Sequence, residues 1–130
     1  MTTNDTPTPE TAPETVPARE PQPIPLDARI REHLSQAASS STGLSIQSLY
    51  GGHPHVLQHN LIALRSGSSL PEHDNPGEAT VLVLRGRVEL RSGTDRWTAG
   101  AGELLVIPPT RHSLHAVEDA AVLLTIAKIS

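Results

Sequence analysis

Two short stretches of the chain carry the side chains that could hold a metal ion or a polar ligand. The first contains His73, Asn75 and Glu78, and the second contains Arg111 and His112. Imidazole nitrogens bind first-row transition metals well, whereas an amide oxygen is a weaker, neutral donor. Because the chain has no cysteine, thiolate zinc sites, disulfides and thiol nucleophiles are excluded. Any metal must therefore be held by histidine, amide and carboxylate groups.

Histidine also occurs outside these two stretches. His53 and His55 flank a proline, which would allow a chelating pair but favours a loop with two solvated imidazoles. His59 lies in an otherwise apolar run, where it either lines a cavity as a ligand contact or is a hydrogen-bonded histidine of the wall. Alternation along a strand places every second residue on one face, so we expect His115 to point away from His112.

The N-terminal segment differs in composition from the rest of the chain. Residues 1–25 hold seven of the twelve prolines, with threonine, glutamate and alanine and almost no large apolar side chain. Such a segment cannot bury enough surface to offset its ordering entropy, so we predict a disordered tail that is dispensable for folding. A helix is predicted over 27–38, with Asp27 as its N-cap. The predicted organisation is this tail, a short helix and linker over 26–42, and a barrel over 43–130.

Beyond the linker the pattern changes to short β-rich runs separated by Gly, Pro and Asp. Strands are predicted over 44–50, 56–64, 79–84, 88–91, 96–98, 103–107, 112–117 and 121–129. The tight connections at 85–87, 92–95 and 118–119 suit hairpins, so we expect antiparallel neighbours throughout. This many closely spaced strands predict an all-β sandwich or closed barrel.

Several of these runs are apolar on both faces. In the run 79–84 two sets of three residues alternate, and both sets are mainly aliphatic; the runs 103–107 and 121–129 are similar. A barrel wall that faces water does not require an apolar outer face. We therefore expect a second layer over the barrel, formed by the helix or by a partner subunit, and predict a homodimer.

The strongest pattern is a pair of spaced motifs. Their matching residues are Gly67, His73, Gly86, Gly102, Pro108 and His112. Together they resemble the two motifs of the cupin superfamily, and the fifteen residues between the motifs are typical of its small single-domain members with a cupin 2-type conserved barrel. The resemblance implies a double-stranded β-helix, or jelly-roll barrel, to which this chain adds its short N-terminal helix.

The same resemblance implies a divalent-metal site that is incomplete here. Family members bind the metal through two histidines and a glutamate of the first motif and a histidine of the second. Asn75 stands in place of one histidine and Ala79 in place of the glutamate, which leaves His73 and His112. Glu78 is one position out of phase, and only a bulge at the preceding Pro-Gly pair would turn it inward. We expect no tightly bound metal, and at most a weak site for iron, manganese, nickel or zinc at His73, Glu78 and His112.

Three functions remain open from the sequence. The first is a barrel that binds a small molecule in an aliphatic cavity, with His73, Asn75 and His112 as polar contacts and Arg111 and His59 as further candidates. The second is a metal-dependent enzyme, such as a dioxygenase or isomerase, that uses the set of two histidines and one carboxylate. The third is a non-catalytic homodimeric sensor or accessory module. The first is favoured because it accounts directly for the missing ligands, although the fold alone cannot choose.

Charge and hydropathy indicate which classes of partner the protein lacks. The formal net charge is -4, and no run of lysine or arginine is dense enough to follow a phosphate backbone. No apolar run approaches the roughly 20 residues that cross a bilayer. The sequence therefore predicts a cytoplasmic protein with a small-molecule ligand and without nucleic-acid or membrane partners.

Overall fold

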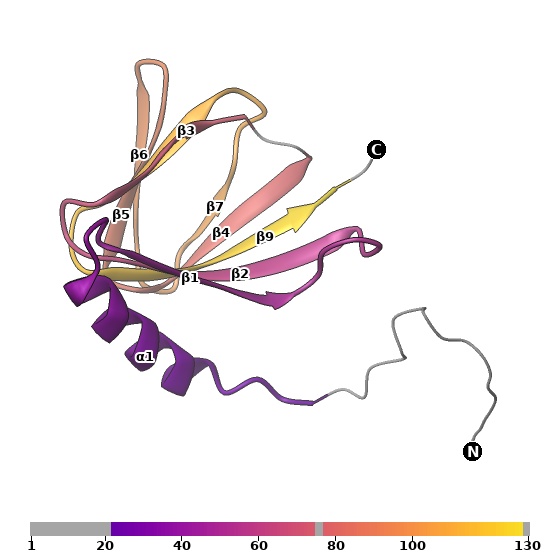
Figure 1. The fold of residues 1–130 in the computed structure, drawn as a ribbon. Coiled ribbons are helices and arrows are strands. Elements are labelled where there is room, and N and C mark those ends of the chain that lie inside the picture. Colours follow the sequence, from indigo (N-terminus) through magenta and orange to yellow (C-terminus); the bar gives the residue numbers. More distant parts are fainter. Residues whose placement is uncertain (1–21, 75–76, 129–130) are drawn as a thin grey trace.

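The computed structural model describes residues 22–74 and 77–128, which contain one helix and nine strands (Figure 1). The helix α1 spans Leu26–Ser39. The strands are β1 Leu44–Tyr50, β2 Leu57–Leu64, β3 Ser69–His73, β4 Glu78–Arg85, β5 Arg87–Ser92, β6 Asp95–Gly100, β7 Leu104–Val106, β8 His112–Ala116 and β9 Ala120–Ala127. The predicted tail lies outside the described residues as far as residue 21, so its disorder stays a prediction. Among the described residues, no helix combines the length and apolar character that crossing a bilayer requires.

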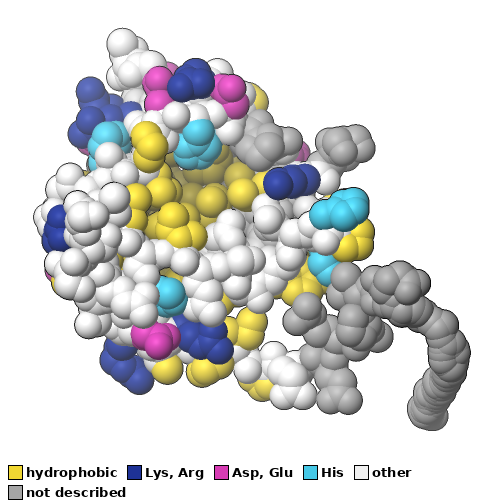
Figure 2. All heavy atoms as spheres, in the orientation of Figure 1, with side chains coloured by type: hydrophobic (Ala, Val, Ile, Leu, Met, Phe, Trp, Pro, Cys, Tyr) yellow, Lys and Arg dark blue, Asp and Glu magenta, His cyan; other side chains and the backbone are white. Residues whose placement is uncertain are grey.

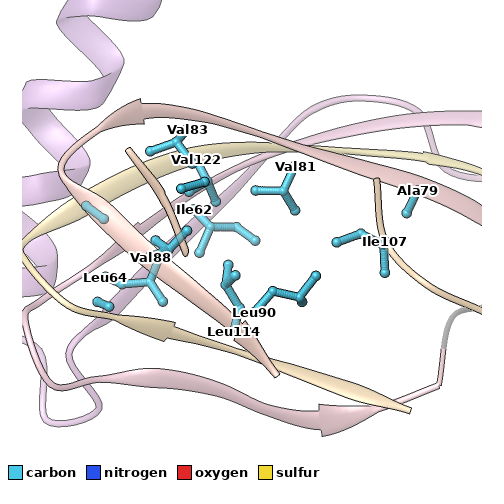
Figure 3. Packing of buried hydrophobic residues seen from close by; sticks show 13 residues of the cluster. Ile62, Leu64, Ala79, Val81, Val83, Val88, Leu90, Ile107, Leu114 and Val122 are labelled. Atoms are coloured by element: carbon cyan, nitrogen blue, oxygen red, sulfur yellow. The ribbon is translucent and has the colours of Figure 1, made fainter. Parts of the chain in front are cut away.

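The strands form two antiparallel sheets that face each other. The five-stranded sheet has the order β1-β2-β9-β4-β7, and the four-stranded sheet has the order β3-β8-β5-β6. Aliphatic side chains from the inner faces of both sheets fill the space between them, among them Val81 and Val83 of β4 and Leu90 of β5 (Figure 3). The jelly-roll barrel with a short N-terminal helix and the antiparallel pairing are thus confirmed.

The sequence analysis misses β3. This strand contains Pro71 and Glu72 and lacks the apolar alternation by which strands are recognised. Proline has no N–H to donate to a ladder, and it is tolerated here because β3 is the edge strand of its sheet. The omission matters for function, because the pairing of β3 with β8 places His73 opposite His112.

Two of the three predicted hairpins are wrong. Residues 92–95 do join β5 to β6 within one sheet, but the turns at Gly86 and at 118–119 lead from one sheet to the other. The two crossings pack together: Gly86 has a φ of 75°, and a Cβ atom there would lie 2.0 Å from the carbonyl oxygen of Asp119. Glycine is therefore required at this crossing. The prediction was wrong because a tight turn between two sheets has the same turn residues as a hairpin within one sheet.

The helix α1 lies across the outer face of β1 and β2 (Figure 1). Its Ile30 packs against Leu61 in a small cluster outside the barrel core. The predicted N-cap is wrong, because Pro25 precedes the first turn and Asp27 lies within it. The Asp27 carboxylate instead pairs with Arg85 at 2.9 Å, which connects the helix to the end of β4.

The helix does not cover all of the large sheet. At the edge strand β7, Leu104 and Val106 are 58% and 74% exposed, whereas Ile107 just beyond the strand is buried in the core. Both faces of β7 are therefore apolar, as the sequence predicts. The helix supplies only part of the expected second layer.

Candidate functional site

His73 and His112 come together across the β3 and β8 pair. The two residues are partners in the strand register, and the centroids of their rings lie 4.5 Å apart in an edge-to-face arrangement. His112 is 5% exposed and shares the inner face of β8 with Leu114 and Ala116, whereas His73 is exposed. The structure thus brings the two motif histidines to one end of the barrel, with His112 the deeper of the pair.

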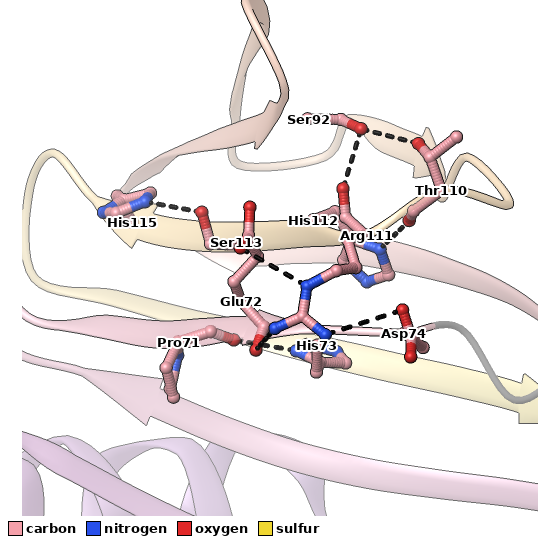
Figure 4. A network of polar contacts seen from close by, with 10 residues as sticks. All are labelled: Pro71, Glu72, His73, Asp74, Ser92, Thr110, Arg111, His112, Ser113 and His115. Atoms are coloured by element: carbon pink, nitrogen blue, oxygen red, sulfur yellow. Dashed lines mark hydrogen bonds and ion pairs between the residues drawn. The ribbon is translucent and has the colours of Figure 1, made fainter.

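Hydrogen bonds to the backbone fix the tautomer of both rings. Nδ1 of His73 lies 2.8 Å from the carbonyl oxygen of Pro71, and Nδ1 of His112 lies 2.9 Å from that of Thr110 (Figure 4). A carbonyl oxygen only accepts, so each Nδ1 must carry a proton and donate it. In the neutral ring the other nitrogen, Nε2, is then a bare acceptor. Both rings therefore present an Nε2 lone pair, and neither Nε2 has a hydrogen-bond partner among the described residues.

The two rings line a small cavity whose other walls are aliphatic. Those walls are Ile62, Leu70, Val81, Ile107, Leu114, Val122 and Leu124. The cavity has a volume of about 20 Å³, which is room for one water-sized group. Figure 2 shows this end of the barrel as a hollow floored by hydrophobic side chains, with histidine side chains at its edge. The site therefore combines two hydrogen-bond acceptors with apolar walls.

Charged side chains lie at the rim beside the two rings. Arg111 pairs with Glu72, with 3.4 Å between Nε and Oε1, and with Asp74, with 3.7 Å between Nη1 and Oδ1 (Figure 4). The guanidinium predicted as a ligand contact is thus at the mouth but already engaged by two carboxylates. The sequence analysis overlooks Glu72 and Asp74, although both flank His73. Two carboxylates against one guanidinium give this group of three side chains one net negative charge.

The structure does not bring Glu78 to the histidines. Glu78 is exposed and pairs in register with Ala127, while Ala79 faces the barrel interior. The register of β4 with β9 is continuous from Glu78 to Val83, so no bulge near Glu78 turns the carboxylate inward. Asn75, the other predicted contact, lies outside the described residues.

The donor set does not fit a tightly held metal. Two imidazole nitrogens are available, whereas the position of the family's glutamate holds the buried Ala79. Within residues 22–74 and 77–128, no three His, Asp or Glu side chains gather where one ion could be held. Divalent transition metals need further donors and compensating charge to be retained.

His59 does not line the barrel cavity. Its Nδ1 lies 3.0 Å from Oγ1 of Thr125, its partner in register, and its ring lies 6.5 Å from that of Tyr50. The alternation of β2 explains this placement, because Ile62 lines the cavity and residues at odd positions face outward. His59 is therefore the hydrogen-bonded wall histidine, and the cavity-lining alternative is wrong. His53 is exposed in the loop, and His55 lies beside Tyr50.

His115 points away from His112, as predicted. Its Nε2 lies 2.8 Å from Oγ of Ser113, and it pairs in register with Glu89 on the outer face of the small sheet. The hydrogen bond from Arg91 holds the pKa of Glu89 below its ordinary value, and burial lowers the pKa of His115. This charged cluster is separate from the cavity, because side chains on opposite faces of one sheet cannot share a site.

One buried histidine escapes the sequence analysis. His33 on α1 is 7% exposed; its Nδ1 lies 2.6 Å from Oγ of Ser45, and its Nε2 lies 2.7 Å from Oε1 of Gln47. Its spacing from Ile30 and Ala37 puts it on the buried face of the helix, which is the signal that would have found it. With both ring nitrogens engaged, His33 connects the helix to β1 and offers no free site.

Comparisons with known proteins agree with this architecture. Residues 60–127 match the model of the cupin domain family. A conserved protein of unknown function from Streptococcus pyogenes is 25% identical, with 70% of this chain and 79% of that chain covered and a TM-score of 0.63. An RmlC-like cupin protein from Desulfovibrio desulfuricans is 30% identical over 65% of this chain and 81% of that chain, with a TM-score of 0.58. A cupin superfamily protein from Desulfitobacterium hafniense, 16% identical, covers 85% of this chain and 94% of its own length with a TM-score of 0.66, which shows the fold alone. None of the curated proteins matches the chain.

Proposed function

Since this chain belongs to the cupin domain family, we propose that it binds a small molecule at the barrel mouth, with the ligand's polar end between His73 and His112. The observation that carries this proposal is the pair of histidine rings that line one apolar cavity, each with its Nδ1 bonded to a backbone carbonyl and its Nε2 without a partner among the described residues. Pockets that bind small molecules combine apolar walls with a few placed polar groups. When the ligand is a signal and not a substrate, the protein is a sensor or accessory module.

The metal-dependent alternative gains no support from the site. It requires a carboxylate beside the two imidazoles, and Glu78 lies on the outer face of β4. Metal binding at the two histidines alone is therefore weak in this proposal.

The proposal includes a homodimer. The exposed Leu104 and Val106 of β7 adjoin Trp97 and Pro108, which line a groove of about 280 Å³ beside the same strand. A stable monomer does not gain from exposing these aliphatic side chains together, whereas a second copy would bury them.

The test of the binding function is a fragment titration of the full chain, followed by NMR of methyl groups that line the cavity. The probes are n-butylamine, n-butanol and butyrate, which share one apolar body and differ in the head group. At least one probe should shift the methyl signals of Val81 and Leu114 in a saturable way, while Val106 on the outer surface should not respond. If none of the three probes shifts the cavity methyls, the binding function is refuted.

A further inference from the structure

We infer that the group bound between His73 and His112 is a hydrogen-bond donor, namely the primary ammonium end of a longer apolar molecule. The inference rests on the proposed function and specifies its ligand class. It is opposite to the anionic ligand that a rim arginine beside a histidine would suggest. Three features of the mouth support it: the acceptor character of both rings, the sign of the charge at the rim and the size of the cavity.

The two rings select a donor. Each Nδ1 is committed to a backbone carbonyl, so the neutral ring can only accept at Nε2. A carboxylate or carbonyl oxygen placed between the rings would set lone pair against lone pair. A hydroxyl has one hydrogen and can satisfy one of the two acceptors, whereas an ammonium group has three hydrogens and can satisfy both. The chemistry of the pair therefore favours an ammonium group over an alcohol, and an alcohol over a carboxylate.

The charge at the rim acts in the same direction. Arg111 is the cation nearest the rings in the sequence, and Glu72 and Asp74 already pair with it. The second carboxylate leaves a net negative charge beside the exposed His73. Opposite charges attract across a partly solvated rim, so a cationic head group is stabilised there and an anionic one is repelled.

The size of the cavity determines how much of the ligand enters it. A volume of about 20 Å³ admits one group of the size of water, which matches an amino group. The surrounding aliphatic walls suit the methylene next to that nitrogen. Because His73 is exposed while His112 is buried, the opening lies on the His73 side, and the rest of the ligand extends outward there. The site thus recognises the end of a molecule and leaves its body at the surface.

The experiment compares n-butylamine, n-butanol and butyrate with the full chain at pH 8, where an ordinary imidazole is neutral. We expect n-butylamine to bind about tenfold more tightly than n-butanol, because a charge-assisted hydrogen bond is worth roughly that factor. Butyrate should be the weakest of the three. Nitrogen-15 shifts of both rings should report protonated Nδ1 and unprotonated Nε2 without ligand, and a change at Nε2 on addition of the amine.

Variants separate the two sources of selectivity. His73→Leu should reduce n-butylamine affinity about tenfold, to the level of n-butanol, because one acceptor is lost. Asp74→Asn should weaken the amine and leave the alcohol unchanged. His115→Leu, on the outer face of β8, is the matched control and should change neither. Tightest binding of butyrate would overturn the ammonium inference and leave the binding function standing, whereas failure of all three probes would overturn both.

Discussion

A divalent metal should change the thermal stability of this protein very little. A ligand that binds only the folded state stabilises it by RT ln(1 + [L]/Kd). Two imidazoles without a carboxylate leave an ion with incomplete coordination, so we expect a Kd no lower than a working concentration of roughly 100 µM. The gain is then at most about 0.4 kcal/mol, or about 2–3 °C in Tm for a domain of this size. Elemental analysis of untagged protein should find well below one equivalent of iron, manganese, nickel or zinc.

Ala79→Glu tests the reason for this weakness. Ala79 faces the barrel interior, whereas Glu78 faces outward, so only the substitution at position 79 returns a carboxylate to the inherited site. Without metal the variant should be destabilised by about 1–3 kcal/mol, because a polar group is buried without a partner. With metal at about a hundredfold excess over Kd it should regain about 2.7 kcal/mol, or about 10–20 °C in Tm. Thermal unfolding with zinc or nickel and with chelator measures both effects.

Glu78→Ala is the matched control and should behave like the parent in every one of these assays. The reasoning fails if purified parent carries a full equivalent of metal and either Glu78→Ala or His112→Ala loses it. That result would mean that the outward carboxylate reaches the histidines in solution. The metal-dependent enzyme would then replace the binding protein as the better proposal.

Three further predictions concern other parts of the molecule. Light scattering at micromolar concentration should give a homodimer for the parent and a monomer for Val106→Asp. The control Ser35→Asp, on the exposed side of the helix, should remain a dimer. A monomeric parent would contradict the proposed interface. His33→Ala should lower the free energy of unfolding in urea by about 1–3 kcal/mol, because two buried hydrogen bonds are lost, while the exposed His53→Ala should have no effect. The lowered pKa of Glu89 stabilises the fold above the ordinary value of 4.5, and this contribution disappears as the pH falls through the lower pKa of the folded state. Glu89→Gln should therefore show a flatter loss of stability in acid than the parent, and an unchanged slope would contradict the pairing.

The barrel was predictable because its signals are local and periodic. Eight of the nine strands coincide with runs that the sequence predicts between turn residues, and the two spaced motifs specify the barrel type. The meeting of His73 and His112 followed from those motifs. The strand that carries His73 was missed, because Pro71 and Glu72 break the pattern and an edge strand tolerates such residues. A motif can therefore place a side chain correctly even where the periodic pattern fails.

The errors arise where the information is not local. A tight turn joins neighbours in one sheet at 92–95, and another tight turn joins opposite sheets at Gly86. The packing of the distant Asp119 against Gly86 belongs to the second case and is not visible in the local sequence. The engagement of Arg111 by Glu72 depends on the same long-range pairing of β3 with β8. Sequence spacing predicts which face a residue occupies, but the partners across that face come from the tertiary fold.

The one-position offset between Glu78 and Ala79 separates the proposed binding function from the metal-dependent alternative. Every residue of β4 from Glu78 to Val83 is in continuous register with β9, and Gly77 leaves no room for a Cβ, which would lie 2.1 Å from the Ala127 carbonyl oxygen. Turning Glu78 inward by a slip of one residue would break this register and exchange the buried Val81 and Val83 for the residues of the opposite face. The fold therefore keeps the carboxylate outside and leaves the two imidazoles as acceptors without a negative charge between them, which is the arrangement that a donor group can occupy.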